Sequence, residues 1–167
     1  MDVTRTYLEM RSPDDLAAAD TGERDLRLEP LAWCPASFYR YLYTEVGRAY
    51  RWHDRAHWSD PQIRTHLARD EVTVWLLTRG GAPAGYFELE RHDADNSVEI
   101  AYFGLLPEAI GRGLGRWLLT EAVRKAWTLG PERVWVHTCT LDHPAALPNY
   151  LARGFRVVRE ERYAVQE

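Results

Sequence analysis

The segment from Pro107 to Gly115 carries the clearest chemical signal in the chain, because its glycines stand between an apolar run and an amphipathic helical pattern. A glycine loop lets backbone N–H groups approach an anion closely, and the N-terminus of a following helix adds unpaired donors and a positive dipole. Arg112 and Arg116 add positive charge at the same place. The order of apolar strand, glycine loop and helix therefore predicts a phosphate-binding site.

Other interpretations of this loop differ in what they require from the sequence. A phosphate loop of the NTPase type ends in Gly-Lys-Ser/Thr, whereas Gly115 is followed by Arg116 and Trp117. A dinucleotide-binding loop has the spacing Gly-x-Gly-x-x-Gly and an acidic residue about 20 residues later. Here the spacing is Gly-x-Gly-x-Gly, and Asp142 lies too far along the chain. A tight turn that binds no ligand stays open as a third interpretation.

The loop resembles the acyl-CoA pyrophosphate motif of the GNAT N-acetyltransferase superfamily. The pattern Ala146-x-x-x-Tyr150-x-x-x-Gly154-Phe155 resembles the last helix of that superfamily and the strand that follows it. Together the matched stretch covers residues 70–160, more than half of the chain. The resemblance implies that the chain binds acetyl-CoA as an acyl donor.

Two positions depart from the pattern of the superfamily. Ile110 stands where Gln or Arg is usual, and His143 stands where Asn is usual. The first change removes a side chain but leaves the backbone donors of the loop. The residues that the resemblance implies for cofactor binding lie in the loop, in the strand before it and ahead of the last helix: Phe103, Leu105, Ile110, Gly111, Arg112, Gly113, Leu114, Gly115, Arg116 and His143.

Acetyl transfer to an amine needs a base, because a primary amine with a pKa of about 10 is protonated at neutral pH. Glu99 is the candidate, since it is an acid within an otherwise apolar run, residues 98–106. It also occupies the place of the base glutamate in the histone-acetylating branch of the superfamily. An outward-facing Glu99, or one paired with an arginine, stays open. Glu88 and His137 on the neighbouring strands are reserve bases.

Tyr150 is the candidate acid, because a phenol is protonated at pH 7 and can donate to a leaving thiolate. Its spacing before Gly154 corresponds to the catalytic tyrosine of superfamily members, and a buried helix tyrosine is the competing interpretation. No motif supports Cys139 as an acyl-accepting nucleophile. Cys139, Asp142 and His143 lack the number and spacing of zinc ligands, so we predict no metal site.

Residues 33–58 hold eight of the twenty aromatic residues in the chain. In proteins that this chain resembles, the first two helices and their connection form the acceptor side of the cleft. We expect most of these aromatic residues to pack in the core and one to three to contact the acceptor, with Tyr39, Tyr43 and Trp52 as the candidates.

Three arginines in the same segment indicate the charge of the acceptor. Arg48, Arg51 and Arg55 can clamp a carboxylate, while aromatic faces favour apolar groups or cations. This combination favours a small amine that carries an acid group, such as an amino acid or a peptide terminus. A polyamine fits less well, because the arginines would repel its additional charges.

The elements that must position these residues follow from hydrophobic periodicity and from turn and cap signals. The predicted strands cover residues 3–10, 25–30, 71–78, 84–90, 98–106 and 133–140, with a last strand from residue 155. The predicted helices start near residues 36, 60, 114 and 146, and a capping box opens the second of them. The expected fold is α/β of the α+β type: a mixed, mostly antiparallel sheet with helices on both faces and a parallel pair at the acetyl-CoA cleft.

Composition limits the alternatives further. The chain has 167 residues, enough for one domain, and we expect residues 1–70 to form the N-terminal strands and acceptor-side helices and residues 71–167 the CoA-binding core. A net charge of −4, with no run of Lys and Arg, argues against a nucleic-acid partner. No segment is typical of a signal peptide or a membrane span, so we expect a cytoplasmic protein that does not bind membranes. A homodimer stays open.

Two functions from different classes follow from these observations. The first is an acetyl-CoA-dependent N-acetyltransferase in which the amine attacks directly within a ternary complex, with a backbone N–H near Phe103 or Leu105 polarising the thioester carbonyl. The second is a non-catalytic acyl-CoA-binding or regulatory module with the same fold. Ile110 is the feature that keeps the second function open.

Overall fold

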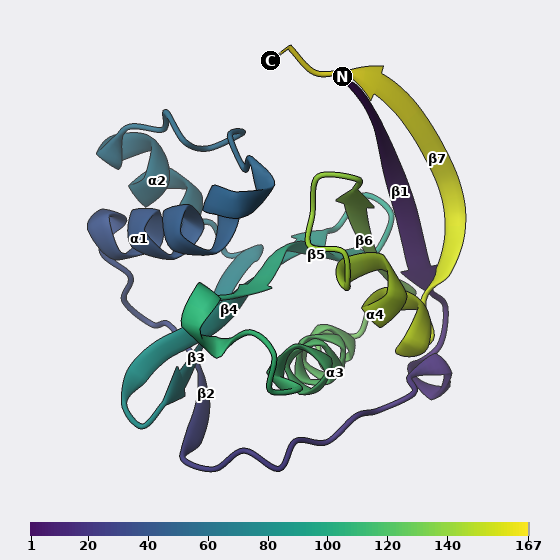
Figure 1. Ribbon diagram of the computed structural model, residues 1–167, viewed down its shortest axis with the longest axis horizontal. Helices are drawn as coiled ribbons and strands as arrows, with labels where there is room; N and C mark the ends of the chain where they lie inside the picture. Colours follow the sequence, from purple (N-terminus) through teal and green to yellow (C-terminus); the bar gives the residue numbers. More distant parts are fainter. Residues whose placement is uncertain (167) are drawn as a thin grey trace.

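The computed structural model describes residues 1–166 and contains one seven-stranded sheet with the strand order β2-β3-β4-β5-β6-β1-β7 (Figure 1). The strands are β1 (Asp2–Met10), β2 (Leu26–Pro30), β3 (Val72–Arg79), β4 (Ala82–His92), β5 (Ser97–Leu105), β6 (Arg133–Cys139) and β7 (Arg156–Ala164). The helices are α1 (Ala36–Gly47), α2 (Asp60–Leu67), α3 (Leu114–Trp127) and α4 (Ala146–Ala152). Short 3-10 turns cover Pro13–Asp15, Arg48–Tyr50 and Pro107–Ala109.

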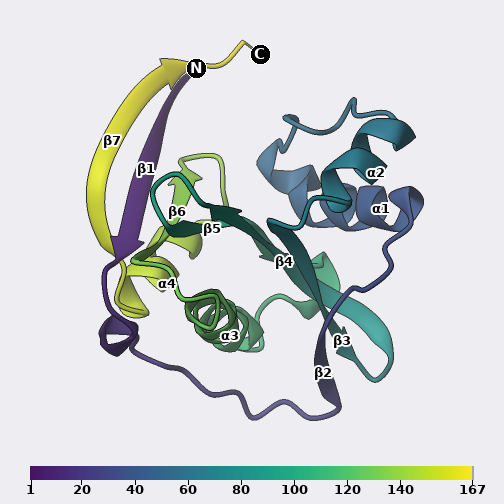
Figure 2. The same cartoon turned by 180° about the vertical axis from the view of Figure 1, so that it is seen from behind.

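Helices cover both faces of the sheet, as predicted (Figures 1 and 2). Helices α3 and α4 lie on one face, and apolar side chains of α3 such as Leu118 and Val123 share a buried cluster with Val98 of β5 and Val134 of β6. Helices α1 and α2 lie on the opposite face over β3 and β4, where a second cluster includes Leu42, Ile63 and Val74. In residues 1–166, no helix has the length and hydropathy needed to cross a membrane.

Local signals explain where several elements begin. The predicted capping box is present at α2, where the Ser59 hydroxyl accepts a hydrogen bond from the backbone of Gln62 and the Gln62 side chain accepts one from the backbone of Ser59. The predicted hairpin between β3 and β4 turns at Gly80 and Gly81, which both have positive φ. The predicted mixed, mostly antiparallel sheet is confirmed, because β5 and β6 are its one parallel pair among the described residues.

Strand β1 lies between β6 and β7 and pairs antiparallel with both. Figures 1 and 2 show β1 and β7 side by side along one edge of the molecule. The sequence predicted a strand over residues 3–10 without a position for it in the sheet. In this position Arg5 of β1 lies opposite Cys139 of β6.

The parallel pairing of β5 and β6 is short. It joins Ser97 to Arg133, Val98 to Val134 and Glu99 to Trp135, and it ends there. On the other side of β5, a bulge shifts the register with β4 at residue 101, because Ile100 and Tyr102 face consecutive residues of β4. Beyond Glu99 the two parallel strands therefore diverge, and an opening forms in the middle of the sheet.

Candidate active site

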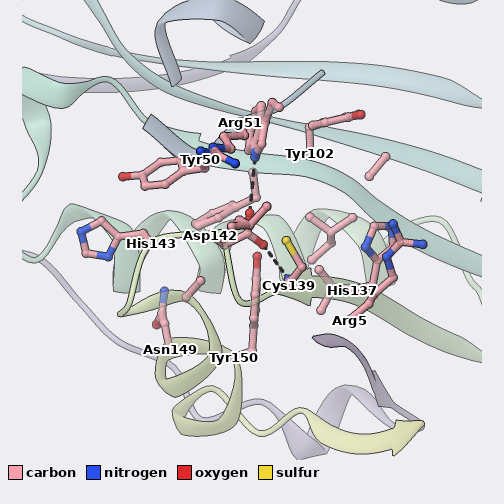
Figure 3. Close-up of a pocket in the computed structure, with 18 of the residues that line it drawn as sticks. Arg5, Tyr50, Arg51, Tyr102, His137, Cys139, Asp142, His143, Asn149 and Tyr150 are labelled. Carbon is pink, nitrogen blue, oxygen red and sulfur yellow. Dashed lines mark hydrogen bonds between the residues drawn. The ribbon is translucent and has the colours of Figure 1, made fainter. Parts of the chain in front are cut away.

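A cavity of about 980 Å³ occupies the opening between β5 and β6. At one end it reaches Gly111 and Arg116 at the start of α3, and at the other it reaches the segment 50–55 that follows α1. Its walls include β5 from Glu99 to Leu105, the end of β6, and α4 (Figure 3). The cavity thus joins the predicted phosphate loop to the predicted acceptor segment through the sheet.

The phosphate end of the cavity has the features of an anion site. Gly111 and Gly113 both have positive φ, and Gly113 is the N-cap of α3 without a side-chain hydrogen bond to the helix. The first N–H groups of α3 are therefore available to a ligand. A Cβ atom at Gly111 would meet no heavy atom within 4 Å, so there is open space at the loop.

Seven of the ten predicted cofactor-binding residues line the cavity: Phe103, Leu105, Ile110, Gly111, Gly115, Arg116 and His143. The other three do not. Leu114 is fully buried in the core, and the Arg112 side chain is exposed and lies 4.0 Å from Glu23. Gly113 faces the guanidinium of Arg116. The side chains of Arg112 and Leu114 thus point away from a ligand, although their backbone groups belong to the loop.

Glu99 is the last residue of β5 that pairs with β6, and its side chain is 14% exposed. The oxygen Oε1 lies 2.9 Å from Nε2 of His92, and Oε2 lies 3.9 Å from Nε2 of His137. Glu99 and His137 both line the cavity. Burial lowers the pKa of His137 against the opposing charge of Glu99, so this imidazole is neutral at pH 7. The partners of Glu99 are thus histidines, and not the arginine that the sequence left open.

Glu88, the reserve base, is fully buried on β4 and does not line the cavity. It accepts a 2.7 Å hydrogen bond from the Tyr39 hydroxyl and bonds of 2.8 and 2.9 Å from Arg55, and it lies 3.1 Å from Nε2 of His66. Burial would raise the pKa of Glu88, but the hydrogen bond with His66 and the charge of Arg55 outweigh it. The pKa of this carboxyl lies below its ordinary value.

The predicted acceptor-side tyrosines lie in and beside this buried network. Tyr39 and Tyr43 are buried and do not line the cavity. The Tyr39 hydroxyl binds Glu88, and the Tyr43 hydroxyl accepts a hydrogen bond from the backbone of Arg55. Their hydroxyl groups hold the acceptor segment in place, and contact of these tyrosines with substrate stays a prediction. Trp52 does line the cavity.

The three arginines of the predicted carboxylate clamp, Arg48, Arg51 and Arg55, have different surroundings in the structure. The Arg55 guanidinium pairs with Glu88 and lies over the rings of Trp58 and Tyr102, at 4.7 and 4.5 Å from their centroids. Arg48 pairs with Glu45 on the outer surface. Arg51 and Arg55 both line the cavity, and among the described residues Arg51 forms no ion pair. Arg5 of β1 also lines the cavity, from a part of the chain that sequence analysis did not connect with the site.

Tyr150 points from α4 toward Asp142 (Figure 3). Tyr150 lines the cavity, and burial together with the charge of Asp142 raises the pKa of this phenol above its ordinary value. The Asp142 carboxylate accepts hydrogen bonds from Thr138 and from the backbone of Cys139, and the Trp52 indole donates to it at 3.5 Å. Trp52 and Asp142 thus meet across the cavity.

Asn149 is a cavity residue that sequence analysis missed. Its amide nitrogen donates to the carbonyl of Gly115 at 3.2 Å, and its Oδ1 atom is buried without a hydrogen-bond partner among the described residues. A buried acceptor without a partner is costly unless a ligand supplies a donor. Its position one residue before Tyr150 was the available signal.

Cys139 and the cluster of Glu90, His92 and Glu99 do not favour a nucleophile or a metal centre. Burial raises the pKa of the Cys139 thiol, which makes it a poor nucleophile. Glu90, His92 and Glu99 bring one ligand atom each within 4.8 Å of one another, as a metal site would need. However, Arg69 forms a 2.8 Å ion pair with Glu90, and His92 bonds to Glu99. We therefore interpret this cluster as a chain of hydrogen bonds.

The comparison with protein families decides the assignment. A family model described as the acetyltransferase (GNAT) family matches residues 35–155, most of the chain. The chain belongs to the GNAT acetyltransferase family. The match begins just before α1 and ends just before β7, so it contains the phosphate loop, both diverging strands and α4. No curated protein matches the chain.

Solved structures with the same fold are distant in sequence. A conserved protein of unknown function from Staphylococcus epidermidis superposes with a TM-score of 0.71 at 16% identity, over 97% of this chain and 60% of its own. A GCN5-related N-acetyltransferase from Kribbella flavida superposes with a TM-score of 0.65 at 19% identity, over 92% of this chain and 54% of its own. An aminoglycoside acetyltransferase from an uncultured soil metagenomic sample superposes with a TM-score of 0.63 at 16% identity, over 77% of this chain and 87% of its own. The chain thus spans about three fifths or less of the first two matched structures.

The buried carboxylate of Glu88 leads to the first prediction. Glu88→Gln should lower the free energy of unfolding by about 3 kcal/mol, because it leaves the charge of Arg55 without its partner. Since folding lowers the pKa of Glu88, its contribution is complete above about pH 4.5 and is lost as the pH falls through the lowered pKa. Chemical denaturation of the wild type should therefore show a loss of stability below about pH 4.5 that the variant lacks.

Glu90→Gln is the matched control for this measurement. The partner of Glu90 is Arg69, which is 43% exposed, so removing this pair should cost about 1 kcal/mol or less. Equal losses of stability in the two variants would contradict the structural role of Glu88.

Proposed function

We propose that the protein is an acetyl-CoA-dependent N-acetyltransferase that acts on a primary amine of a small molecule. The observation that carries the proposal is the continuous cavity, which runs from an uncapped helix N-terminus to a partly buried carboxylate between two diverging strands. Such a cavity fits an extended donor with phosphate at one end and a reacting group at the other. Members of the GNAT family generally use acetyl-CoA as the donor.

Two features of the cavity support acetyl-CoA as the donor. The N–H groups at the start of α3 and the Arg116 side chain fit the pyrophosphate. The buried Oδ1 atom of Asn149 fits an amide N–H donor, which the pantetheine arm contains. Ile110 lines the cavity without a polar group, so the backbone must supply most of the phosphate contacts.

Gly115→Asp tests the phosphate site without a change in backbone strain. The φ of Gly115 is not positive, and a Cβ atom there would meet only the Leu105 side chain at 3.8 Å. A carboxylate at this position should repel the pyrophosphate and weaken acetyl-CoA binding by about 100-fold or more, measured by isothermal titration calorimetry. The side chain in Gly115→Asn has nearly the same size as in Gly115→Asp but no charge, so this variant should lose much less affinity for acetyl-CoA. Unchanged affinity in the folded Asp variant would place the phosphate elsewhere.

In the proposed reaction, acetyl-CoA supplies the thioester and the chain supplies a base, an oxyanion donor and a donor for the leaving sulfur. Oε2 of Glu99 takes the proton of the attacking amine. A backbone N–H of β5 near Phe103 or Leu105 donates to the carbonyl oxygen as negative charge develops on it. The Tyr150 hydroxyl donates a hydrogen bond to the sulfur. Burial and the charge of Asp142 raise the pKa of Tyr150, which keeps that hydroxyl protonated.

Glu99→Gln tests the base. The amide keeps the size of the side chain and cannot take a proton, so kcat at pH 7 should fall by about 100-fold or more. The affinity for acetyl-CoA should stay within about twofold, because the phosphate site lies at the other end of the cavity. Steady-state release of CoA thiol measures the rate. A variant within about twofold of the wild-type rate would show that Glu99 is not the base, and a wild type that releases no CoA with any amine would favour a non-catalytic module.

The acceptor end of the cavity has charges of both signs. Glu90, Glu99, Arg5 and Arg51 all line it, and Arg5 is partly neutralised by Glu161. A zwitterion that places its amine at Glu99 and its carboxylate at Arg51 fits this arrangement. We therefore propose an amino acid or a peptide terminus as the acceptor.

A panel of amines tests the acceptor class. Amino acids should give higher kcat/KM than spermidine, an aromatic amine or an aminoglycoside, the class named for one of the solved structures above. Arg51→Gln should lower kcat/KM for amino acids by about tenfold and leave that for uncharged amines unchanged. Arg48→Gln, on the outer surface, is the control. The acceptor proposal fails if spermidine or the aminoglycoside exceeds every amino acid by tenfold.

A further inference from the structure

The two oxygens of the Glu99 carboxylate have different surroundings. Oε1 lies 2.9 Å from Nε2 of His92, within hydrogen-bond distance. Oε2 lies on the side of His137, at 3.9 Å, which is too long for a hydrogen bond. His137 belongs to the cavity wall, whereas His92 does not. Oε1 is therefore within hydrogen-bond distance of a residue outside the cavity wall, and Oε2 faces the cavity.

Strand register explains why His92 reaches Glu99. Glu90 lies directly opposite Glu99 in the β4–β5 ladder, and His92 follows Glu90 by two residues, so all three side chains share one face of the sheet. The imidazole of His92 stacks on Trp135 of β6, with ring centroids 5.6 Å apart and planes 30° apart. The histidine ring is thus fixed by the strand on the far side of Glu99.

The two carboxylates around His92 favour a hydrogen-bond donor at Nε2. Two carboxylates directly opposite each other on neighbouring strands repel. Arg69 offsets the charge of Glu90 at 2.8 Å, and Nε2 of His92 lies between the two acids, 3.4 Å from Oε2 of Glu90 and 2.9 Å from Oε1 of Glu99. Because ionised carboxylates only accept hydrogen bonds, Nε2 carries the proton in this arrangement.

We propose that His92 is a positioning residue for Glu99. Its N–H donates to Oε1, fixes the plane of the carboxylate and leaves Oε2 directed at the amine of the acceptor. This inference rests on the proposed role of Glu99 as the base. His92 acts only through Glu99, since His92 itself does not line the cavity.

Three substitutions separate this role from simple packing. His92→Gln places an amide N–H close to the position of Nε2. His92→Asn carries the same amide on a side chain that is one carbon shorter, and His92→Leu has no donor. We expect kcat to stay within about threefold of wild type for Gln and to fall by about tenfold or more for Asn and Leu, because a misplaced base loses its near-attack geometry. The affinity for acetyl-CoA should not change in any of them.

A double-mutant cycle shows whether His92 acts through Glu99. In the Glu99→Gln background, adding His92→Leu should change kcat by less than about twofold, since the group that His92 orients is no longer a base. His57→Gln, an exposed histidine of the segment before α2 that does not line the cavity, should keep the wild-type rate.

Several results would overturn the inference. Independent, additive losses from the two positions would show that His92 has a role of its own, and a Gln variant as slow as Leu would show that the hydrogen bond is not what matters. Loss of activity after treatment of the wild type with EDTA would make Glu90, His92 and Glu99 a metal centre. If Glu99→Gln is slow but His92→Asn and His92→Leu keep the wild-type rate, only the role of His92 is refuted. If Glu99→Gln is active, the role of Glu99 as the base is refuted.

Discussion

The short parallel pairing of β5 and β6 is the constraint on which the rest of the site depends. Three residue pairs join the strands, and the bulge at residue 101 then turns β5 away, so the cavity passes through the middle of the sheet. Backbone groups that leave a ladder need other partners, and a ligand can supply them. Glu99 stands at the point of divergence, which explains how a side chain within an apolar strand reaches the cavity.

A buried carboxylate fixes the other wall of the site. Glu88 of β4 binds Tyr39 of α1, Arg55 of the following segment and His66 of α2, so one charge holds three separate pieces of the helical layer to the sheet. Because Arg55 lies close to Trp52 in sequence, this contact also sets the position of the ring that meets Asp142 across the cavity. The acceptor side is therefore positioned by an ion pair that takes no part in the proposed chemistry.

Features with a local signal could be predicted from the sequence. The capping box at Ser59, the turn at Gly80 and Gly81 and the strand–loop–helix order around Gly113 each depend on residues a few positions apart, and the structure contains all three. The side chains of Tyr39 and Arg55 could not be placed in this way. They turn inward because Glu88 lies on a strand more than thirty residues later, and no local pattern shows that contact. The position of β1 has the same cause, since it depends on pairing with strands at the far end of the chain.

The raised pKa of Tyr150 limits what this residue can do for the leaving group. A thiol has a pKa of about 8.5, whereas burial and the charge of Asp142 hold the pKa of Tyr150 above the ordinary value of about 10 for a phenol. Complete transfer of the phenol proton to a thiolate is therefore uphill. A hydrogen bond that strengthens as negative charge develops on sulfur has no such cost. In the proposed reaction Tyr150 thus keeps its proton and stabilises the thiolate, which takes its own proton from solvent once it leaves the cavity.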